Sequence, residues 1–188
     1  MRIISGNFKG RKLIEPLDSN TRPLKDLTKE SIFNVIDHSR KFQFNFTNSD
    51  VLDIFSGVGS FGLECVSRGC NNVSFVESHR PALEILKKNI KKLDIFKKTK
   101  VIEEDIFNFL DRYYDNKNFD LIFLDPPYIF KNINTLFNKI HSNQLLKKNG
   151  ILILHRHRKK SDFIKNDFVE IDVRRYGISK IVFLKLGK

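Results

Sequence analysis

The sequence predicts an α/β fold with a mostly parallel sheet, because short β-rich segments alternate with helical patterns from about residue 51 onward. Five strands are expected in this part of the chain: 51–55, 73–77, 100–103, 119–124 and 151–154. Two more β-rich segments, 168–176 and 180–186, are separated only by Gly177, Ile178 and Ser179, which is too short for a parallel crossover. The chain should therefore end in an antiparallel hairpin.

An amphipathic helix is expected between the second and third strands, with Pro81 near its start. Its apolar residues recur at helical spacing: Leu83, Leu86, Ile90 and Leu93. A second helix is expected over about 26–38, after a polar and basic arm. At 188 residues the chain has the size of one domain. We expect a single domain, 1–188, in which the arm and helix of residues 1–40 form a small N-terminal extension packed on the core, 50–188.

Composition restricts the partners and the compartment. The chain has 34 Lys and Arg residues against 22 Asp and Glu residues, a formal charge of +12, which favours a polyanionic partner. Charge alone does not choose between RNA, DNA and a membrane surface. Cys65 and Cys70 cannot form a disulfide framework, and no segment has the pattern of a signal peptide or a membrane span. We therefore expect a cytoplasmic protein with no membrane partner. We also expect a monomer, on which these features do not bear.

A glycine loop follows the first expected strand directly. Gly57, Gly59 and Gly62 have the G-x-G-x-x-G spacing that, between a strand and a helix, is typical of a Rossmann-like nucleotide site. Such a loop turns tightly and lets a ligand approach the backbone, so we expect Phe55, Ser56, Gly57 and Gly59 to line a cofactor. Glu77 ends the next strand, where its carboxylate can accept the hydrogen bonds of a ribose diol. NAD and S-adenosylmethionine both contain that ribose.

Asp53 separates these two cofactors. A carboxylate at the end of the first strand would repel a pyrophosphate, whereas it attracts the α-ammonium and the sulfonium of S-adenosylmethionine. The sequence therefore favours S-adenosylmethionine over NAD. After the third strand, Asp105 could accept a hydrogen bond from the adenine amino group, with Ile106 packed on the ring. Taken alone, that acidic segment is more often a solvated turn or a helix cap.

Asp125, Pro126, Pro127 and Tyr128 end the buried strand 119–124. Two consecutive prolines cannot donate to a strand ladder, so polar groups of this segment should point outward and form a rigid platform. Hydrogen bonds from an exocyclic amino group to the Asp125 carboxylate and the Pro126 carbonyl would aim its nitrogen at a methyl group. Tyr128 could stack on a base. The alternative is an ordinary proline-rich strand exit.

A run of histidines and basic residues, 155–160, follows the fifth expected strand. It should flank the same edge of the sheet, and we expect Arg156 and Arg158 to contact phosphates there, in preference to a merely solvated charge run. His155 and His157 do not indicate a metal site, because neither a cysteine nor a second pair of ligands is nearby. No Ser-His-Asp arrangement is suggested by spacing.

These motifs together resemble the RsmD-type methyltransferases, which modify a guanine N2 of small-subunit ribosomal RNA. The resemblance covers nearly the whole chain and rests on the opening segment 1–6 with Lys9, Gly10 and Arg11, on Arg22, Pro23 and Asp26, and on segments 29–34, 51–62, 75–77 and 125–128. It implies a seven-stranded methyltransferase fold and S-adenosylmethionine as the donor. It also implies recognition of RNA in an assembled or assembling small subunit.

Carried over by position, the resemblance gives Arg22 a place in the wall of the cofactor pocket. It also implies RNA contacts for Lys9, Arg11 and Lys12. Two segments depart from the family: Leu24 and Leu27 stand near positions that usually hold Thr and Arg, and His155 follows the fifth strand where an acidic residue is common. The contacts of the first segment therefore stay open.

The function expected from the sequence is methyl transfer from S-adenosylmethionine to the N2 of a guanine in 16S ribosomal RNA. The choice of guanine as the methylated base rests on the family resemblance alone. Methylation of adenine N6 in DNA or RNA shares the same chemistry and remains an alternative. A non-catalytic RNA-binding factor of ribosome assembly that retains the fold is a further one.

Overall fold

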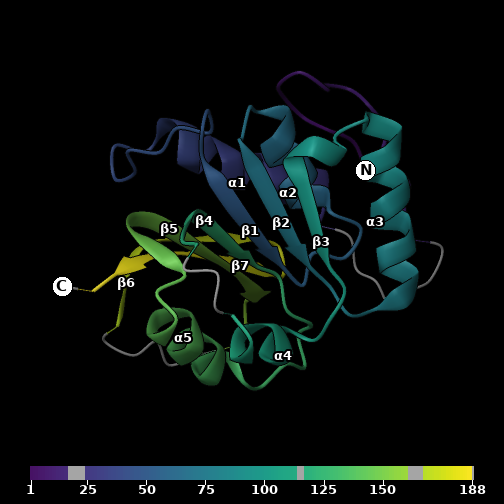
Figure 1. Cartoon of the computed structure of the whole chain (residues 1–188). Helices are drawn as coiled ribbons and strands as arrows, with labels where there is room; N and C mark the ends of the chain where they lie inside the picture. Colours follow the sequence, from purple (N-terminus) through teal and green to yellow (C-terminus); the bar gives the residue numbers. More distant parts are fainter. Residues whose placement is uncertain (17–23, 114–116, 161–166, 188) are drawn as a thin grey trace.

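A computed structural model describes residues 1–16, 24–113, 117–160 and 167–187. In this part of the chain one seven-stranded sheet has the order β3-β2-β1-β4-β5-β7-β6 (Figure 1). The strands are β1 (Asp50–Ile54), β2 (Asn72–Val76), β3 (Thr99–Ile102), β4 (Phe119–Leu124), β5 (Leu146–His157), β6 (Phe168–Tyr176) and β7 (Ser179–Leu186). The helices are α1 (Asp26–His38), α2 (Ser60–Ser67), α3 (Arg80–Leu93), α4 (Ile106–Asp111) and α5 (Ile133–Ser142), with a 3-10 turn, η1 (Phe96–Lys98).

The sheet is parallel from β3 to β5 and antiparallel in its last two strands. Gly177, with φ +56°, lies in the turn of the β6–β7 hairpin. The predicted α/β fold, with its mostly parallel sheet and its antiparallel C-terminal hairpin, is confirmed. Both bounds of β5 were wrong, because it begins at Leu146 instead of residue 151 and continues to His157 instead of ending at residue 154, whereas the other strand bounds differ by at most one residue. The second difference bears on the site. There Arg156 and His157 pair with Lys180 and Ser179 of β7, which the sequence of β5 alone does not reveal.

Side chains alternate between two apolar cores, one on each face of the sheet. Residues such as Val51, Phe123 and Ile153 pack with α1, α2 and α3. Their neighbours Leu52, Leu124 and Leu154 pack on the other face, where α4 and α5 lie (Figure 1). Positions 53, 125 and 155 therefore share the face that is covered by α1, α2 and α3.

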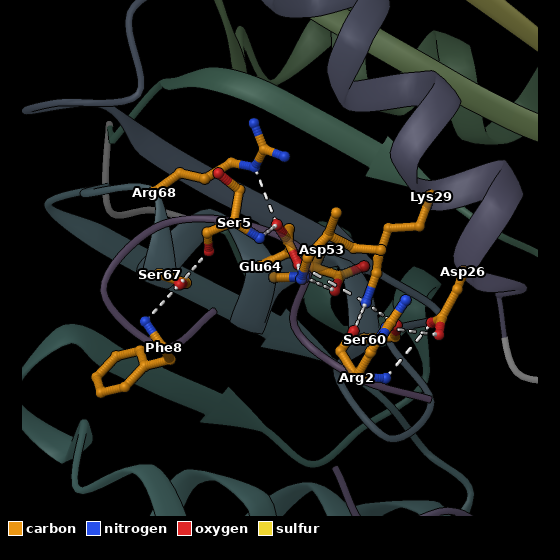
Figure 2. A network of polar contacts seen from close by, with 12 residues as sticks. Arg2, Ser5, Phe8, Asp26, Lys29, Asp53, Ser60, Glu64, Ser67 and Arg68 are labelled. Carbon is orange, nitrogen blue, oxygen red and sulfur yellow. Dashed lines mark hydrogen bonds and ion pairs between the residues drawn. The ribbon is translucent and has the colours of Figure 1, made fainter. Parts of the chain in front are cut away.

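The first sixteen residues form an ordered arm, which is joined to α2 by buried polar contacts (Figure 2). Glu64 of α2 is fully buried and accepts hydrogen bonds from the backbone N–H groups of Ile4, at 2.7 Å, and Ser5, at 2.9 Å. Lys29 of α1 is fully buried as well, and its ammonium lies 3.7 Å from Glu64. The ammonium also donates to the Arg2 carbonyl at 2.7 Å. This joint connects the arm and α1 to the helix that follows the glycine loop.

Along the described ranges, no helix combines the length and the apolar character that a membrane crossing requires.

Candidate cofactor and substrate site

Three carboxylates meet at the carboxyl edge of the sheet, on the face covered by α2. Asp53 of β1 lies between Phe75 of β2 and Phe123 of β4 in the strand register. Glu77 and Asp125 follow those two neighbours by two residues, so their side chains return to the same face. We call Asp53, Glu77 and Asp125 the acidic set. Such an edge is where open α/β sheets bind ligands.

The glycine loop turns between β1 and α2 with backbone angles that favour glycine. Gly57 and Gly59 have φ values of +54° and +84°, and the Gly59 N–H donates to the Ser56 carbonyl at 2.8 Å. Phe55 also has a positive φ, +59°, which is uncommon for an aromatic residue and typical of a strained functional site. Its ring packs edge-on against Phe130 at 5.1 Å, beside the segment that follows β4.

Asp53 lies beneath this loop with only 1% of its surface exposed. Its carboxylate accepts one backbone hydrogen bond, from Gly62 at 2.9 Å. Burial raises the pKa of Asp53 well above its usual range, and the charges of Asp125 and Glu77 raise it further, against the opposing effect of the Gly62 N–H. A bound cation would favour the ionised carboxylate.

Glu77 joins the glycine loop to the start of α3. One of its carboxylate oxygens accepts from Gly57 at 2.7 Å, and the other accepts from the N–H groups of Ser78 and His79 at 2.9 and 2.8 Å. Nearby, the buried Ser56 hydroxyl has no hydrogen-bond partner among the described residues. An unsatisfied buried hydroxyl costs free energy, so this position suits a ligand that hydrogen-bonds to it.

The residues expected around an adenine ring have clear structural roles of their own. Asp105 caps α4, since its carboxylate accepts from the Phe107 N–H at 2.8 Å. This is the helix-cap alternative that the sequence left open. Ile106 is only 3% exposed and packs into the core on the α4 and α5 face. An adenine contact for either residue stays a prediction.

The segment after β4 forms a turn beside the acidic set. The Asp125 N–H donates to the Ile54 carbonyl at 3.3 Å, and the Phe130 N–H closes the turn on the Pro127 carbonyl at 2.8 Å. Pro126 is buried and Pro127 is exposed. The Tyr128 ring lies edge-on to two histidine rings, His155 at 6.1 Å and His157 at 5.1 Å.

His155 is a site residue that sequence reasoning missed. Its Nδ1 lies 2.8 Å from the Asp125 carboxylate, and its Nε2 lies 2.8 Å from the Ser179 hydroxyl. Spacing along the chain did not suggest an Asp-His-Ser arrangement, because the three residues come from β5, β7 and the end of β4. The histidine that follows the expected fifth strand, where the family resemblance implied an acid, was the available signal.

Arg156 does not form the expected phosphate-contacting rim. Only 2% of it is exposed, and its guanidinium donates to the carbonyls of Pro127, at 3.3 Å, and Phe130, at 3.0 Å. The prediction was wrong because β5 extends past residue 154, which turns this side chain inward. Arg158 is exposed, and its guanidinium donates to the Gly177 carbonyl at 3.3 Å.

The basic residues of the arm lie along α2 and not at one end of it. Lys12 pairs with Arg2 near the start of α2, where the Lys29 ammonium donates to the Arg2 carbonyl and to the Ser60 hydroxyl. Lys9, Arg11 and Lys12 are exposed, and the neighbouring Asn7 N–H donates to the Ser67 carbonyl, at the end of α2. That end of α2 is the one farthest from the glycine loop. Arg22 lies outside the described residues.

The side chains and backbone groups at this edge suit an organic cation such as S-adenosylmethionine. The acidic set would face its positive charges, and the unpaired Ser56 hydroxyl and the open glycine backbone would face its polar groups. Within the described ranges, no three His, Cys, Asp or Glu side chains are placed to hold a metal ion. Three neighbouring carboxylates thus favour a positively charged ligand.

Comparisons with known proteins agree with this geometry. The family model described as Conserved hypothetical protein 95 matches residues 1–185. The putative rRNA methyltransferase YlbH of Bacillus subtilis is 33% identical over 187 residues, covering 98% of each chain. The ribosomal RNA small subunit methyltransferase D of Haemophilus influenzae is 32% identical, covering 95% of this chain and 90% of its own.

A solved structure, that of a putative methylase from Haemophilus influenzae, superposes on the whole fold. Its TM-score is 0.79 at 28% identity, covering 100% of this chain and 98% of the other. The agreement thus extends from the sequence to the arrangement of strands and helices. The chain belongs to the RsmD-type methyltransferase family, whose model carries the description Conserved hypothetical protein 95.

Proposed function

We propose that this protein transfers a methyl group from S-adenosylmethionine to the exocyclic N2 of a guanine in 16S ribosomal RNA. Methyl transfer to ribosomal RNA follows from the family. The observation that carries the choice of an amino nitrogen is the Asp125 carboxylate, which His155 fixes at the edge of the sheet where the glycine loop begins. One carboxylate oxygen accepts a hydrogen bond from the histidine, and the other has no hydrogen-bond partner among the described residues, so it can accept an N–H from a base.

The cofactor is S-adenosylmethionine, which supplies a methyl group activated by its sulfonium when it is bound. Asp53 and Glu77 hold the cofactor side of the site through charge and through the glycine loop. Asp125 and the Pro126 carbonyl accept the N–H groups of the base and turn its nitrogen lone pair toward the methyl group. Tyr128 offers its ring to the base, a contact of about 1–3 kcal/mol in single-strand binders.

The rate enhancement in this proposal comes mainly from alignment. The nitrogen, the methyl carbon and the sulfur must lie in line, and two fixed acceptors specify the direction of the amino group. The amino nitrogen loses one proton during or after transfer, to Asp125 or to water. We further propose that the protein acts as a monomer on RNA within an assembled or assembling small subunit.

Transfer of labelled methyl groups to purified small subunits and to naked 16S RNA, followed by nucleoside analysis, tests this function. Label in N2-methylguanosine supports it. Label in N6-methyladenosine instead would assign the site to adenine. Tight cofactor binding with no transfer to either RNA would favour a non-catalytic role in ribosome assembly.

Asp125→Ala tests the division of roles within the site. Because the acceptor of the base N–H is removed, transfer should fall by about 10²- to 10⁴-fold, while cofactor affinity stays nearly unchanged. Single-turnover kinetics and calorimetry measure the two quantities. Asp111→Ala, an exposed acid on α4, is the matched control and should affect neither. Equal loss of transfer and of cofactor affinity would contradict the assigned roles.

A further inference from the structure

The end of β5 contacts the segment that follows β4 from both faces of the sheet. His155 and Arg156 are neighbours in an extended strand, so their side chains point to opposite faces. Both nevertheless contact residues 125–130, His155 at Asp125 and Arg156 at Pro127 and Phe130. This double contact requires β5 to continue past residue 154, and pairing with β7 supports that extension.

His155 is held in one orientation by its two hydrogen bonds. It is 6% exposed, and because a carboxylate oxygen is an acceptor, Nδ1 donates to Asp125. Nε2 then accepts a hydrogen bond from the Ser179 hydroxyl, and the two atoms lie 2.8 Å apart. Ser179 lies in β7, which is paired directly with β5. The Asp125 carboxylate is therefore held in its orientation by a hydrogen bond from a ring that is itself fixed by two adjacent strands.

Arg156 fixes the backbone on the other face. A buried guanidinium is costly unless its N–H groups are paired, and here two of them point at carbonyls of one turn, Pro127 and Phe130. The Phe130 N–H bonds back to Pro127 across the same turn at 2.8 Å. Tyr128 lies inside this turn, so the position of its ring depends on the arginine.

We propose that His155 and Arg156 are positioning residues for methyl transfer. His155 orients the carboxylate that accepts the base amino group, and Arg156 holds the turn that presents Tyr128. Neither side chain touches the reacting atoms. This inference rests on the proposed function, and it assigns the polar end of β5 a part in the reaction instead of a part in binding RNA phosphates.

Two substitutions of His155 separate orientation of Asp125 from general packing. The amide nitrogen of asparagine takes about the place of Nδ1, whereas that of glutamine takes about the place of Nε2. His155→Asn should keep the hydrogen bond to Asp125 and retain kcat within about threefold. His155→Gln should lose that bond and lower kcat by about tenfold to a hundredfold, since small misplacements in a site cost that much. KM for RNA and the cofactor Kd should change by less than about twofold.

Arg156→Lys and Arg156→Met provide the second measurement. The lysine variant keeps one donor and should retain part of the activity. The methionine variant keeps the volume without a donor and should raise KM for RNA by about tenfold or more, because the Tyr128 turn is released. His38→Asn, at the exposed end of α1, is the surface control. Circular dichroism and thermal unfolding establish that each variant is folded.

The outcomes distinguish this inference from the proposed function. A wild-type protein that methylates no RNA would overturn both. A wild-type protein that is active, with both His155 variants equal to it or both equally impaired, would overturn the inference alone. If neither Arg156 variant folds, the pair of His155 variants still decides, because their kcat values must diverge while both remain folded.

Discussion

Two buried carboxylates, close in the chain, have opposite surroundings. Glu64 of α2 is 0% exposed and receives the N–H groups of Ile4 and Ser5, the Arg68 guanidinium at 3.0 Å, and the nearby ammonium of Lys29 (Figure 2). Asp53 of β1 is 1% exposed and, among the described residues, accepts one hydrogen bond, from the Gly62 N–H. The charges that act on it are those of two other carboxylates.

The difference separates a structural charge from one that suits a ligand. A buried carboxylate is tolerated when cations and N–H groups surround it, so Glu64 is complete without any ligand. Burial lowers the pKa of Lys29, while the neighbouring Glu64 charge raises it and partly compensates. Among the residues that the structure describes, no such cation pairs with Asp53, and a positively charged ligand would supply one. Replacing each carboxylate by its amide should therefore have opposite effects on stability.

Glu64→Gln should have the largest effect. One acceptor becomes an NH₂ group that faces other donors, and Lys29 loses its counter-charge in a buried position. Breaking a buried pair costs about 3–5 kcal/mol of the free energy of unfolding, and the arm should detach from α2. Urea denaturation measures the loss, and proteolysis of the first sixteen residues measures the detachment.

Glu30→Gln is the matched control, because Glu30 is exposed on α1. Its free energy of unfolding should change by less than about 0.5 kcal/mol, as for most surface substitutions. A loss below about 1 kcal/mol for Glu64→Gln would mean that the buried joint does not hold the arm.

Gly6→Ala and Gly10→Ala test the same joint through the backbone. Both glycines have left-handed φ values, +80° and +82°, so alanine costs about 1–2 kcal/mol at either position. Only at Gly6 would the added Cβ also meet a backbone atom, the Ser67 carbonyl oxygen, at 1.9 Å. At Gly10 nothing lies within 4 Å.

The difference between the two alanine variants therefore measures how tightly the arm docks on the end of α2. We expect Gly6→Ala to destabilise the protein by at least about 1 kcal/mol more than Gly10→Ala in urea denaturation. Equal losses would show that the arm moves away from α2 at little cost, which would leave Glu64 as the main link between them.

The fold was predictable because its signals are local. The strand segments and the short hairpin connection each depend on neighbouring residues, and the sheet confirmed them, with a connection of two residues instead of three. The end of β5 was not predictable from its own sequence, since a run of histidine and arginine reads as a solvated surface. Pairing with β7 makes it a strand, and only then does Arg156 turn inward and His155 meet Asp125. Those contacts join residues about thirty positions apart.

The glycine loop shows the same division between local and distant signals. The spacing of Gly57, Gly59 and Gly62 located the turn, but it did not reveal that Glu77 binds the loop or that Asp53 lies beneath it. Nor did it reveal the Glu64 joint, whose partners Ile4 and Ser5 come from the other end of the chain. Side chains that connect distant segments are fixed by packing, and hydrophobic periodicity carries no information about them.

Asp53→Asn should have the smallest effect on stability, and in the opposite direction. Because the folded-state pKa of Asp53 is raised, the fold binds its proton more tightly than the unfolded chain does. The stabilisation is complete below the ordinary carboxyl pKa of 3.8 and is lost as pH rises through the raised value. An amide cannot ionise, and its oxygen can still accept from Gly62. The variant should therefore gain stability relative to the wild type as pH rises toward neutrality.

Asp53→Asn should weaken cofactor binding, although it should stabilise the fold near neutral pH. Loss of the charge that attracts the α-ammonium should weaken S-adenosylmethionine binding by about tenfold or more at neutral pH, as expected for a hydrogen bond to a charged group. Thermal unfolding across pH and calorimetry with the cofactor measure the two effects, with the exposed Asp94→Asn as the control. A variant that is less stable than the wild type at neutral pH and binds the cofactor equally well would make Asp53 a structural residue like Glu64.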